Sequence, residues 1–281
     1  AEAWPGAITA WLAEAAEHAW VPAVLGAGER AATVYTRHGL DALELGDEAI
    51  LDVEGFSLEG RPMRTVRQAV NRIRRSGVTA RVDRVGDLSE ATLEEVRAAA
   101  TAWRDGPTER GFSMALGRFG DPGDPCCVLV RAVGPDDDLV GLLHLVPWSR
   151  DGLSLDLMRR GASADNGLVE FLVAELMGWS AANGVRRVSL NFAVFRAVFA
   201  RGERVGAGPV LRLWRRVLVG ASRLWQIESL YRANAKFQPL WVPRFVCFPS
   251  SHDLPRIVVA ALRAEAFLVA PRWWGRHRGL S

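Results

Sequence analysis

Apolar residues recur at helical spacing in several stretches of the chain. The segment 63–75 is the clearest, because Val66, Val70 and Ile73 share one face and arginines occupy much of the rest. Ser89, a preferred N-cap residue, precedes another such stretch. The pattern predicts helices over residues 6–19, 29–38, 63–75, 89–103, 167–182, 209–233 and 256–269.

Short apolar or alternating runs between these helices predict strands. Three of them follow one another in the middle of the chain, separated by turns at Gly134–Asp136 and Ser149–Gly152. Three consecutive antiparallel strands exclude a doubly wound nucleotide-binding fold. The expected strands cover residues 20–25, 42–45, 49–53, 78–84, 127–133, 139–148, 153–159, 185–192 and 242–248.

From residue 78 onward, the order of elements is that of an acyltransferase of the GNAT type, in which two central strands splay apart and open a cleft. Residues 1–60 show only the later part of the same order, as if the front half had been removed. The predicted fold class is α/β with a mixed sheet, built as tandem GNAT-like folds. We expect the C-terminal half of a first unit at 1–60, a basic connecting helix at 61–77, a second, catalytic unit at 78–270, and a basic, Trp-containing tail or linker at 271–281.

The composition, with 49% apolar and 24% charged residues, is that of a folded globular protein and excludes a disordered chain. No run of about 18 apolar residues is present that could span a bilayer. Three cysteines cannot build a disulfide framework and lack metal-ligand spacing, which favours a reducing compartment. Because the first residues include no Met and no basic signal region, we expect a cut point within a longer protein.

The net charge of +3 hides a strong division of charge along the chain. Residues 1–60 hold eleven acids and two arginines, whereas residues 61–84 hold eight arginines and one Asp. Residues 186–256 hold thirteen basic and three acidic residues. Such clusters point to a polyanion, nucleic acid or phospholipid headgroups, although solvated arginine-rich helix faces give the same pattern. The single lysine, Lys236, is either a group that Arg cannot replace or a chance survivor of a biased composition.

The turn at residues 159–167 argues against acetyl-CoA. GNAT enzymes that use this cofactor carry a glycine-rich loop here, whose N–H groups hold the pyrophosphate at a helix N-terminus. In this chain the glycine spacing is wrong and Asp165 would repel phosphate, so we expect no cofactor. His144, in mid-strand, is either a satisfied core histidine or a side chain that faces the cleft.

The most specific chemical signal lies at residues 155–159. Period-two alternation places Leu155, Leu157 and Arg159 on one face of the strand, and Asp156 on the other. If the strand bends where the pair splays, Asp156 and Arg159 both reach the opening. There an acid and a guanidinium can hold an amino group and a phosphate or carboxylate. A surface ion pair is the alternative.

Several strings follow one another in a specific order and spacing. They are Gly46-Asp47-Glu48-Ala49, then Asp52-Val53-Glu54-Gly55-Phe56-Ser57-Leu58-Glu59-Gly60, Met63-Arg64 with Arg67 and Asn71-Arg72, Gly111-Phe112-Ser113-Met114 with Gly117-Arg118-Phe119, Leu155-Asp156-Leu157-Met158-Arg159, and Lys236-Phe237 with Pro239, Trp241 and Pro243-Arg244-Phe245. Over residues 46–248 this set resembles the cytosolic catalytic domain of phosphatidylglycerol lysyltransferases, the MprF family, most closely its LysX type. The chain departs from the family at residues 190–196, where only Asn191 of the usual string is kept.

The resemblance implies transfer of an aminoacyl group from aminoacyl-tRNA to the glycerol hydroxyl of phosphatidylglycerol, without metal or CoA. Lysyl-phosphatidylglycerol adds positive charge to the membrane and so repels cationic peptides. The LysX type implies membrane helices before this domain and a fused lysyl-tRNA synthetase after it. We therefore expect a soluble fragment of a protein anchored at the cytoplasmic face of the cell membrane. The expected partners are lysyl-tRNA, phosphatidylglycerol and the anionic membrane surface.

The same resemblance suggests which residues act. Asp156 or Glu228 would hold the lysine ammonium or the attacking hydroxyl, and the choice stays open. Lys236 and Arg244 would hold the phosphate or the developing oxyanion, and Arg159 would orient the lipid phosphate. The expected substrate-binding residues are Arg64, Arg67, Arg72, Arg118 and Asn191.

Two other functions fit the same features. A transferase that uses aminoacyl-tRNA with another acceptor would share the scaffold, and a non-catalytic module that binds tRNA or anionic lipid would share the charge. Only the two transferases predict that Asp156→Ala abolishes turnover and leaves tRNA binding largely unchanged.

Overall fold

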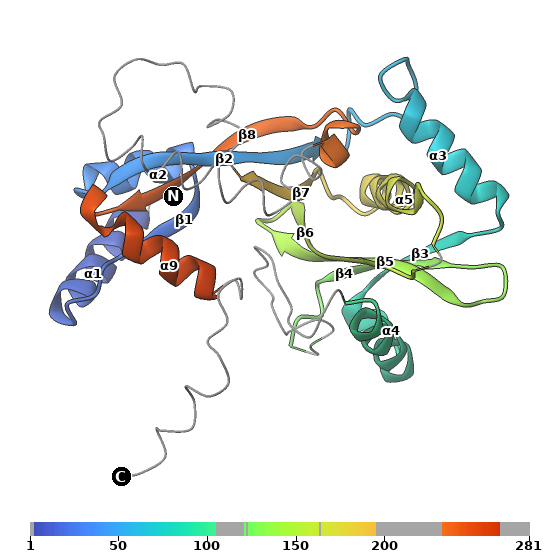
Figure 1. Ribbon diagram of the computed structural model, residues 1–281, viewed down its shortest axis with the longest axis horizontal. Coiled ribbons are helices and arrows are strands. Elements are labelled where there is room, and N and C mark those ends of the chain that lie inside the picture. Colours follow the sequence, from blue (N-terminus) through green and yellow to red (C-terminus); the bar gives the residue numbers. More distant parts are fainter. Residues whose placement is uncertain (1–2, 105–120, 122, 163, 195–231, 265–281) are drawn as a thin grey trace, which may run out of the picture.

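The computed structural model describes residues 3–104, 121, 123–162, 164–194 and 232–264, in which one sheet is covered by helices (Figure 1). The strands are β1 (Val24–Gly28), β2 (Asp41–Asp52), β3 (Thr79–Arg84), β4 (Val128–Val133), β5 (Leu139–Trp148), β6 (Gly152–Arg160), β7 (Arg187–Val194) and β8 (Leu240–Phe248). The helices are α1 (Trp4–Glu17), α2 (Glu29–Arg37), α3 (Arg64–Arg75), α4 (Glu90–Ala102), α5 (Leu168–Ala182) and α9 (Leu254–Ala264).

The sheet is mixed, with the strand order β1-β8-β2-β7-β6-β5-β4-β3. β6 and β7 are parallel, and the other described pairs are antiparallel. The predicted α/β class with a mixed sheet is confirmed. β8 lies between β1 and β2, so the last described strand is inserted between the first two. Residues 1–60 and the following part thus share one sheet, and their division into two units stays a prediction.

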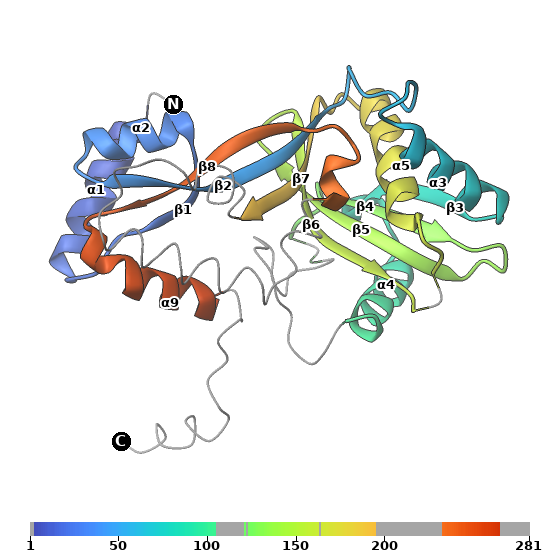
Figure 2. The same ribbon diagram turned by 45° about the horizontal axis from the view of Figure 1, so that its top comes forward.

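Opposite faces of the β7–β3 half are covered by different helices. α3 and α5 bury Val66, Val70 and Phe171 in the main core on one face. α4 packs on the other face, where its Val96 shares a buried cluster with the strand residue Leu142. Figure 2 shows this arrangement, with the sheet between α3 and α5 on one side and α4 on the other. Strands β4, β5 and β6 therefore present residues to two separate cores.

The β1–β8–β2 half is built in the same way from smaller cores. α1 and α2 pack against Cys247 of β8, and α9 packs against Val246 and Phe248, the residues on either side of it. The alternation along β8 thus puts these helices on opposite faces, as Figure 2 also shows. The long strands β2 and β8 connect the two halves of the molecule (Figure 1).

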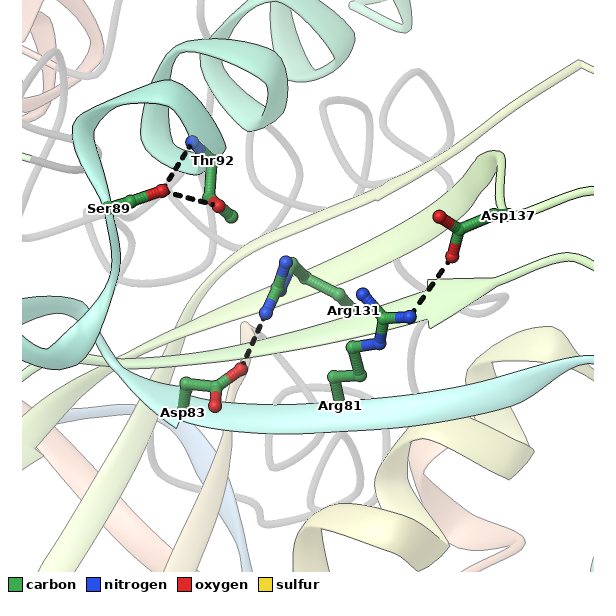
Figure 3. A network of polar contacts seen from close by, with 6 residues as sticks. All are labelled: Arg81, Asp83, Ser89, Thr92, Arg131 and Asp137. Carbon is green, nitrogen blue, oxygen red and sulfur yellow. Dashed lines mark hydrogen bonds and ion pairs between the residues drawn. The ribbon is translucent and has the colours of Figure 1, made fainter.

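Polar contacts fix α4 and the edge strand β3 (Figure 3). Ser89 is the N-cap of α4, as predicted, and its Oγ accepts a hydrogen bond at 3.2 Å from the N–H three residues ahead. Arg131 of β4 is paired with Asp83 of β3 at 2.7 Å, and Arg81 with Asp137 at 3.0 Å. Charged side chains along an edge strand oppose its pairing with another chain.

Two boundaries differ from the prediction. The expected strands at 42–45 and 49–53 are one strand, β2, although Asp47 and Glu48 interrupt its apolar pattern. Both acids are buried, and Glu48 accepts hydrogen bonds from other strands. The expected strand at 20–25 begins later, as β1. The predicted helix at 209–233 lies almost wholly outside the described residues.

Candidate functional site

The parallel pairing of β6 and β7 is short. Gly152–Ser154 lies opposite Arg187–Ser189, and the described pairing ends there. Just beyond this point, Nδ2 of Asn191 donates a hydrogen bond to the carbonyl oxygen of Leu155 at 3.1 Å. The sheet therefore opens between the C-terminal halves of the two strands, the splayed pair expected from the order of elements.

Asp156 lies in a β-bulge of β6. His144 of β5 is opposite Leu157, and the next residue of β5 is opposite Leu155, so Asp156 is the extra residue between the two pairs. Leu155 packs in the core under α5, and Leu157 packs under α4. The predicted placement of these two leucines on one face is wrong, because the extra residue reverses the alternation.

The Asp156 carboxylate is paired with a histidine. Its Oδ2 lies 3.0 Å from His144 Nδ1, and the two side chains are only 4% and 2% exposed. His144 shares the α4 face with its cross-strand neighbour Leu157. A surface ion pair of Asp156 is therefore excluded. The one sequence signal for this pair is the polar His144 in an otherwise apolar strand, since buried polar groups need partners.

The bulge brings Arg159 to the same face as Asp156. Arg159 lies opposite Leu142, which packs under α4. Its Nη1 donates a hydrogen bond to the carbonyl oxygen of Met158 at 3.0 Å. An acid and a guanidinium thus follow each other along the strand that borders the opening.

Arg244, Glu48 and Ser189 form a bonded cluster across β8, β2 and β7. Arg244 Nη2 donates to Glu48 Oε2, and Ser189 Oγ donates to Glu48 Oε1 at 2.6 Å. Burial lowers the pKa of the Arg244 guanidinium. Val188 and Leu190 pack in the core under α5, so Ser189 between them faces the same side as Asp156.

Trp148, at the end of β5, is approached by two guanidinium groups. The Arg187 guanidinium lies 5.0 Å from the centre of its ring and that of Arg244 lies 6.0 Å away, both within cation–π range. Arg187 also donates a hydrogen bond to Asp151 at 2.9 Å, which lowers the pKa of that carboxyl. Positive charge and an aromatic ring thus border the Glu48 cluster.

Lys236 belongs to the opposite side of the sheet. Its Nζ bonds to Oε1 of Glu170, in the first turn of α5, at 2.9 Å, and the next residue, Phe237, is buried in the core under α5. The described contacts therefore join Lys236 to α5 and not to Asp156. Glu170, together with Asp165 just before the helix, puts carboxylates where a CoA pyrophosphate would lie, which is a poor fit to that cofactor.

The arginines of α3 lie on the α5 side as well. Arg67 Nη1 donates to the carbonyl oxygens of Leu58 and Gly60, and Arg72 Nη2 donates to that of Asn166. Arg64 is exposed. Arg67 and Arg72 thus hold loops in place, and the structure does not bring them to the opening. Two further expected residues, Glu228 and Arg118, lie outside the described residues.

Within the described ranges, no group of three or more His, Cys, Asp or Glu side chains is arranged to hold a metal ion. A search of the same residues finds no helix with the length and apolar character needed to cross a membrane.

A sheet that opens between two parallel strands, with a buried carboxylate–histidine pair and arginines beside the opening, defines an acyltransferase-like protein. The family model described as "Phosphatidylglycerol lysyltransferase, C-terminal" matches residues 1–248. The chain belongs to this family, so the resemblance found in the sequence is confirmed.

The relatives are longer proteins. The chain is 57% identical over 267 residues to the lysylphosphatidylglycerol biosynthesis bifunctional protein LysX of Nocardia farcinica, covering 95% of this chain and 24% of that protein. It is 54% identical over 272 residues to the protein of the same name from Rhodococcus opacus, covering 97% of this chain and 24% of the relative. The chain thus spans about a quarter of the length of these relatives.

Two solved structures share the fold. L-PGS from Bacillus licheniformis matches with a TM-score of 0.79 at 21% identity, over 95% of this chain and 80% of that one. The C-terminal domain of a putative lysylphosphatidylglycerol synthetase from Agrobacterium fabrum matches with a TM-score of 0.73 at 20% identity, over 94% of this chain and 77% of that one.

Proposed function

We propose that this chain transfers lysine from lysyl-tRNA to a glycerol hydroxyl of phosphatidylglycerol, forming lysyl-phosphatidylglycerol. The observation that carries the proposal is the buried Asp156–His144 pair beside the opening between β6 and β7. Family membership and the names of the LysX relatives support the choice of lysine and of this lipid. Extra positive charge on the membrane would then lower its attraction for cationic peptides.

The reaction is an ester exchange. The lipid hydroxyl attacks the carbonyl carbon of the lysyl ester, the bond from that carbon to the ribose oxygen breaks, and the hydroxyl proton ends on the ribose oxygen. Because the aminoacyl ester is already activated, positioning and charge stabilisation can supply most of the acceleration. No external oxidant, reductant or metal is needed for this balance.

Asp156 is proposed to accept the proton of the attacking hydroxyl. A carboxylate fixed by His144 at 3.0 Å has a defined direction, which a general base requires. Arg159 and Arg244 lie on the same side of the sheet and are proposed to hold the lipid phosphate and the developing oxyanion. Glu228 is proposed to hold the lysine ammonium.

Polyanion binding is assigned to α3. Arg61 and Arg64 are exposed at its start, where the tRNA backbone or lipid headgroups can bind them. Asn191, in contrast, is proposed to act by holding a wall of the site, since its side chain is bonded to the carbonyl oxygen of Leu155. In the whole protein we place the reaction at the cytoplasmic face of the membrane, beside a fused lysyl-tRNA synthetase.

The direct test is to mix the protein with lysyl-tRNA carrying labelled lysine and with liposomes, and to count label extracted into chloroform. Label in the lipid phase with phosphatidylglycerol liposomes, and none with phosphatidylcholine liposomes, is the expected result. Label recovered in a peptide or another lipid would favour a transferase with a different acceptor. Bound tRNA without transfer to any acceptor would favour a non-catalytic binding module and contradict the proposal.

A further inference from the structure

We propose that Glu48 is a positioning residue. It fixes β8, which carries Arg244, relative to β6, which carries Asp156, across the opening. The inference rests on the proposed function, because both of those groups are proposed to act on the substrates. Glu48 itself has no described contact with Asp156, so it would act through the strands.

The first step is that the Glu48 carboxylate accepts hydrogen bonds from two different strands. Its Oε2 accepts a hydrogen bond from the Arg244 guanidinium, and its Oε1 accepts one from the Ser189 hydroxyl at 2.6 Å. The carboxylate of a middle strand thus binds the strand on either side, β8 and β7. Glu48 is only 9% exposed and Ser189 is fully buried, so water does not replace either contact.

The second step carries the constraint from Ser189 to β6. Ser189 Oγ accepts a hydrogen bond from the backbone N–H of Asn191 at 3.1 Å, and the Asn191 side chain donates to the carbonyl oxygen of Leu155 at 3.1 Å. Leu155 immediately precedes Asp156. The chain of hydrogen bonds therefore crosses the strands at the point where β6 and β7 separate.

The third step is the backbone of Asn191. Its φ is 70°, in the left-handed region that residues other than glycine seldom adopt and that Asn tolerates better than most. Such a conformation persists where surrounding contacts impose it. The bond to Ser189 is one of those contacts, so loss of the hydroxyl is expected to release Asn191 and alter the separation of the strands.

The fourth step explains why a carboxylate is required at position 48. Both partners of Glu48, Arg244 and Ser189, donate hydrogen bonds to it, and the carboxylate offers one acceptor oxygen to each. In Glu48→Gln one of those oxygens becomes an NH₂ group, which cannot accept from either neighbour. The volume is unchanged, so the substitution breaks one link without leaving a cavity.

The test compares Glu48→Gln and Ser189→Ala with the wild type in the lysyl transfer assay. Both variants are expected to lower kcat roughly 10- to 100-fold, the usual effect of a small misplacement of reacting groups, with KM for tRNA and lipid within about twofold. Combined, they should lower kcat no further than Glu48→Gln alone, because they break one chain. Ser180→Ala is the matched control: Ser180 is equally buried and lies on α5, and its hydroxyl has no hydrogen-bond partner within the described part of the chain.

A second readout does not need turnover. Amide hydrogen exchange of residues 155–160 and 190–194 is expected to quicken about tenfold or more in Ser189→Ala and to stay at the wild-type rate in Ser180→Ala. Unchanged exchange would overturn the inference, whatever the activity. Faster exchange with wild-type kcat would overturn it too, and would leave the proposed function intact. A wild-type protein that transfers no lysine would overturn the proposed function and the inference with it.

Discussion

Asp156 Oδ2 lies 3.0 Å from Nδ1 of His144, although the strand register pairs His144 with Leu157 and not with Asp156. The contact exists because Asp156 is the extra residue of a β-bulge. Bulges recur where a strand must redirect a side chain. Here the bulge turns an acid towards a buried histidine at the edge of the opening between β6 and β7.

Removing the histidine should destabilise the fold. His144→Ala leaves the Asp156 carboxylate buried without this partner, so the free energy of unfolding is expected to fall by roughly 2–4 kcal/mol. Urea unfolding measures the change. His252→Ala is the control, because His252 is exposed and bonds only within its own turn among the described contacts. Equal stability of the two variants would contradict the assigned burial of the pair.

Gly28→Ala should impair transfer more than stability. A Cβ at position 28 would lie 2.6 Å from the Arg244 guanidinium, the far end of a flexible side chain, which must then shift and so disturb its contact with Glu48. We expect a fall in kcat of about tenfold and a change in unfolding free energy below about 1 kcal/mol.

The control for that variant is Gly6→Ala in α1, where a Cβ meets nothing within 4 Å. It should transfer lysine at the wild-type rate and be more stable by about 0.5–1 kcal/mol, since Ala is the better helix former. A Gly28→Ala protein with wild-type kcat would show that the position of Arg244 does not matter.

Replacing each of two glycines near α5 by Ala should change the stability of the protein in opposite directions. Gly167 has a φ of 103°, and a Cβ there would lie 2.9 Å from Ala69 Cβ of α3. Gly167→Ala is therefore expected to lose roughly 1–3 kcal/mol of stability through strain and displacement of α3. Gly178→Ala, in mid-helix with nothing within 4 Å, should gain about 0.5–1 kcal/mol. Thermal or urea unfolding measures both changes in stability. Equal changes in the two variants would contradict the packing of α3 on α5.

The exposed start of α3 should contribute to tRNA binding through charge alone. Arg64→Gln is expected to weaken binding and to reduce the slope of log K against log salt by about 0.7–0.9, the value for one lost phosphate contact. Filter binding of tRNA over a salt series measures this slope. Arg81→Gln is the control, since Arg81 is exposed on β3 and already paired with Asp137. An equal loss in both variants would indicate diffuse attraction instead of a site on α3.

Local patterns in the sequence were sufficient for most elements. Ser89 marks the start of α4, and the apolar face of α3 follows from Val66, Val70 and Ile73, because these features depend on neighbours within one or two turns. The insertion of β8 between β1 and β2 was not predictable in this way, since it joins residues about two hundred positions apart.

The candidate site was only partly predictable for the same reason. Asp156 and Arg159 were identified from their motif, but the bulge that turns them to one face depends on the register with β5. Glu48 and Ser189 were missed as partners, because a buried acid in a strand is recognised only when the donors on other strands are known. Asp47 and Glu48 even suggested a break in β2 that does not exist.

The most direct test of the central claim is the single-turnover rate of lysine transfer in Asp156→Asn, measured beside tRNA binding. The matched control is Asp137→Asn, the same change at an exposed residue on a turn with a φ of 60°, which Asn tolerates. The account predicts a loss of about 100-fold or more in Asp156→Asn, the usual contribution of a general base, with tRNA binding unchanged and Asp137→Asn at the wild-type rate. A folded Asp156→Asn protein that transfers lysine as fast as the control would contradict it.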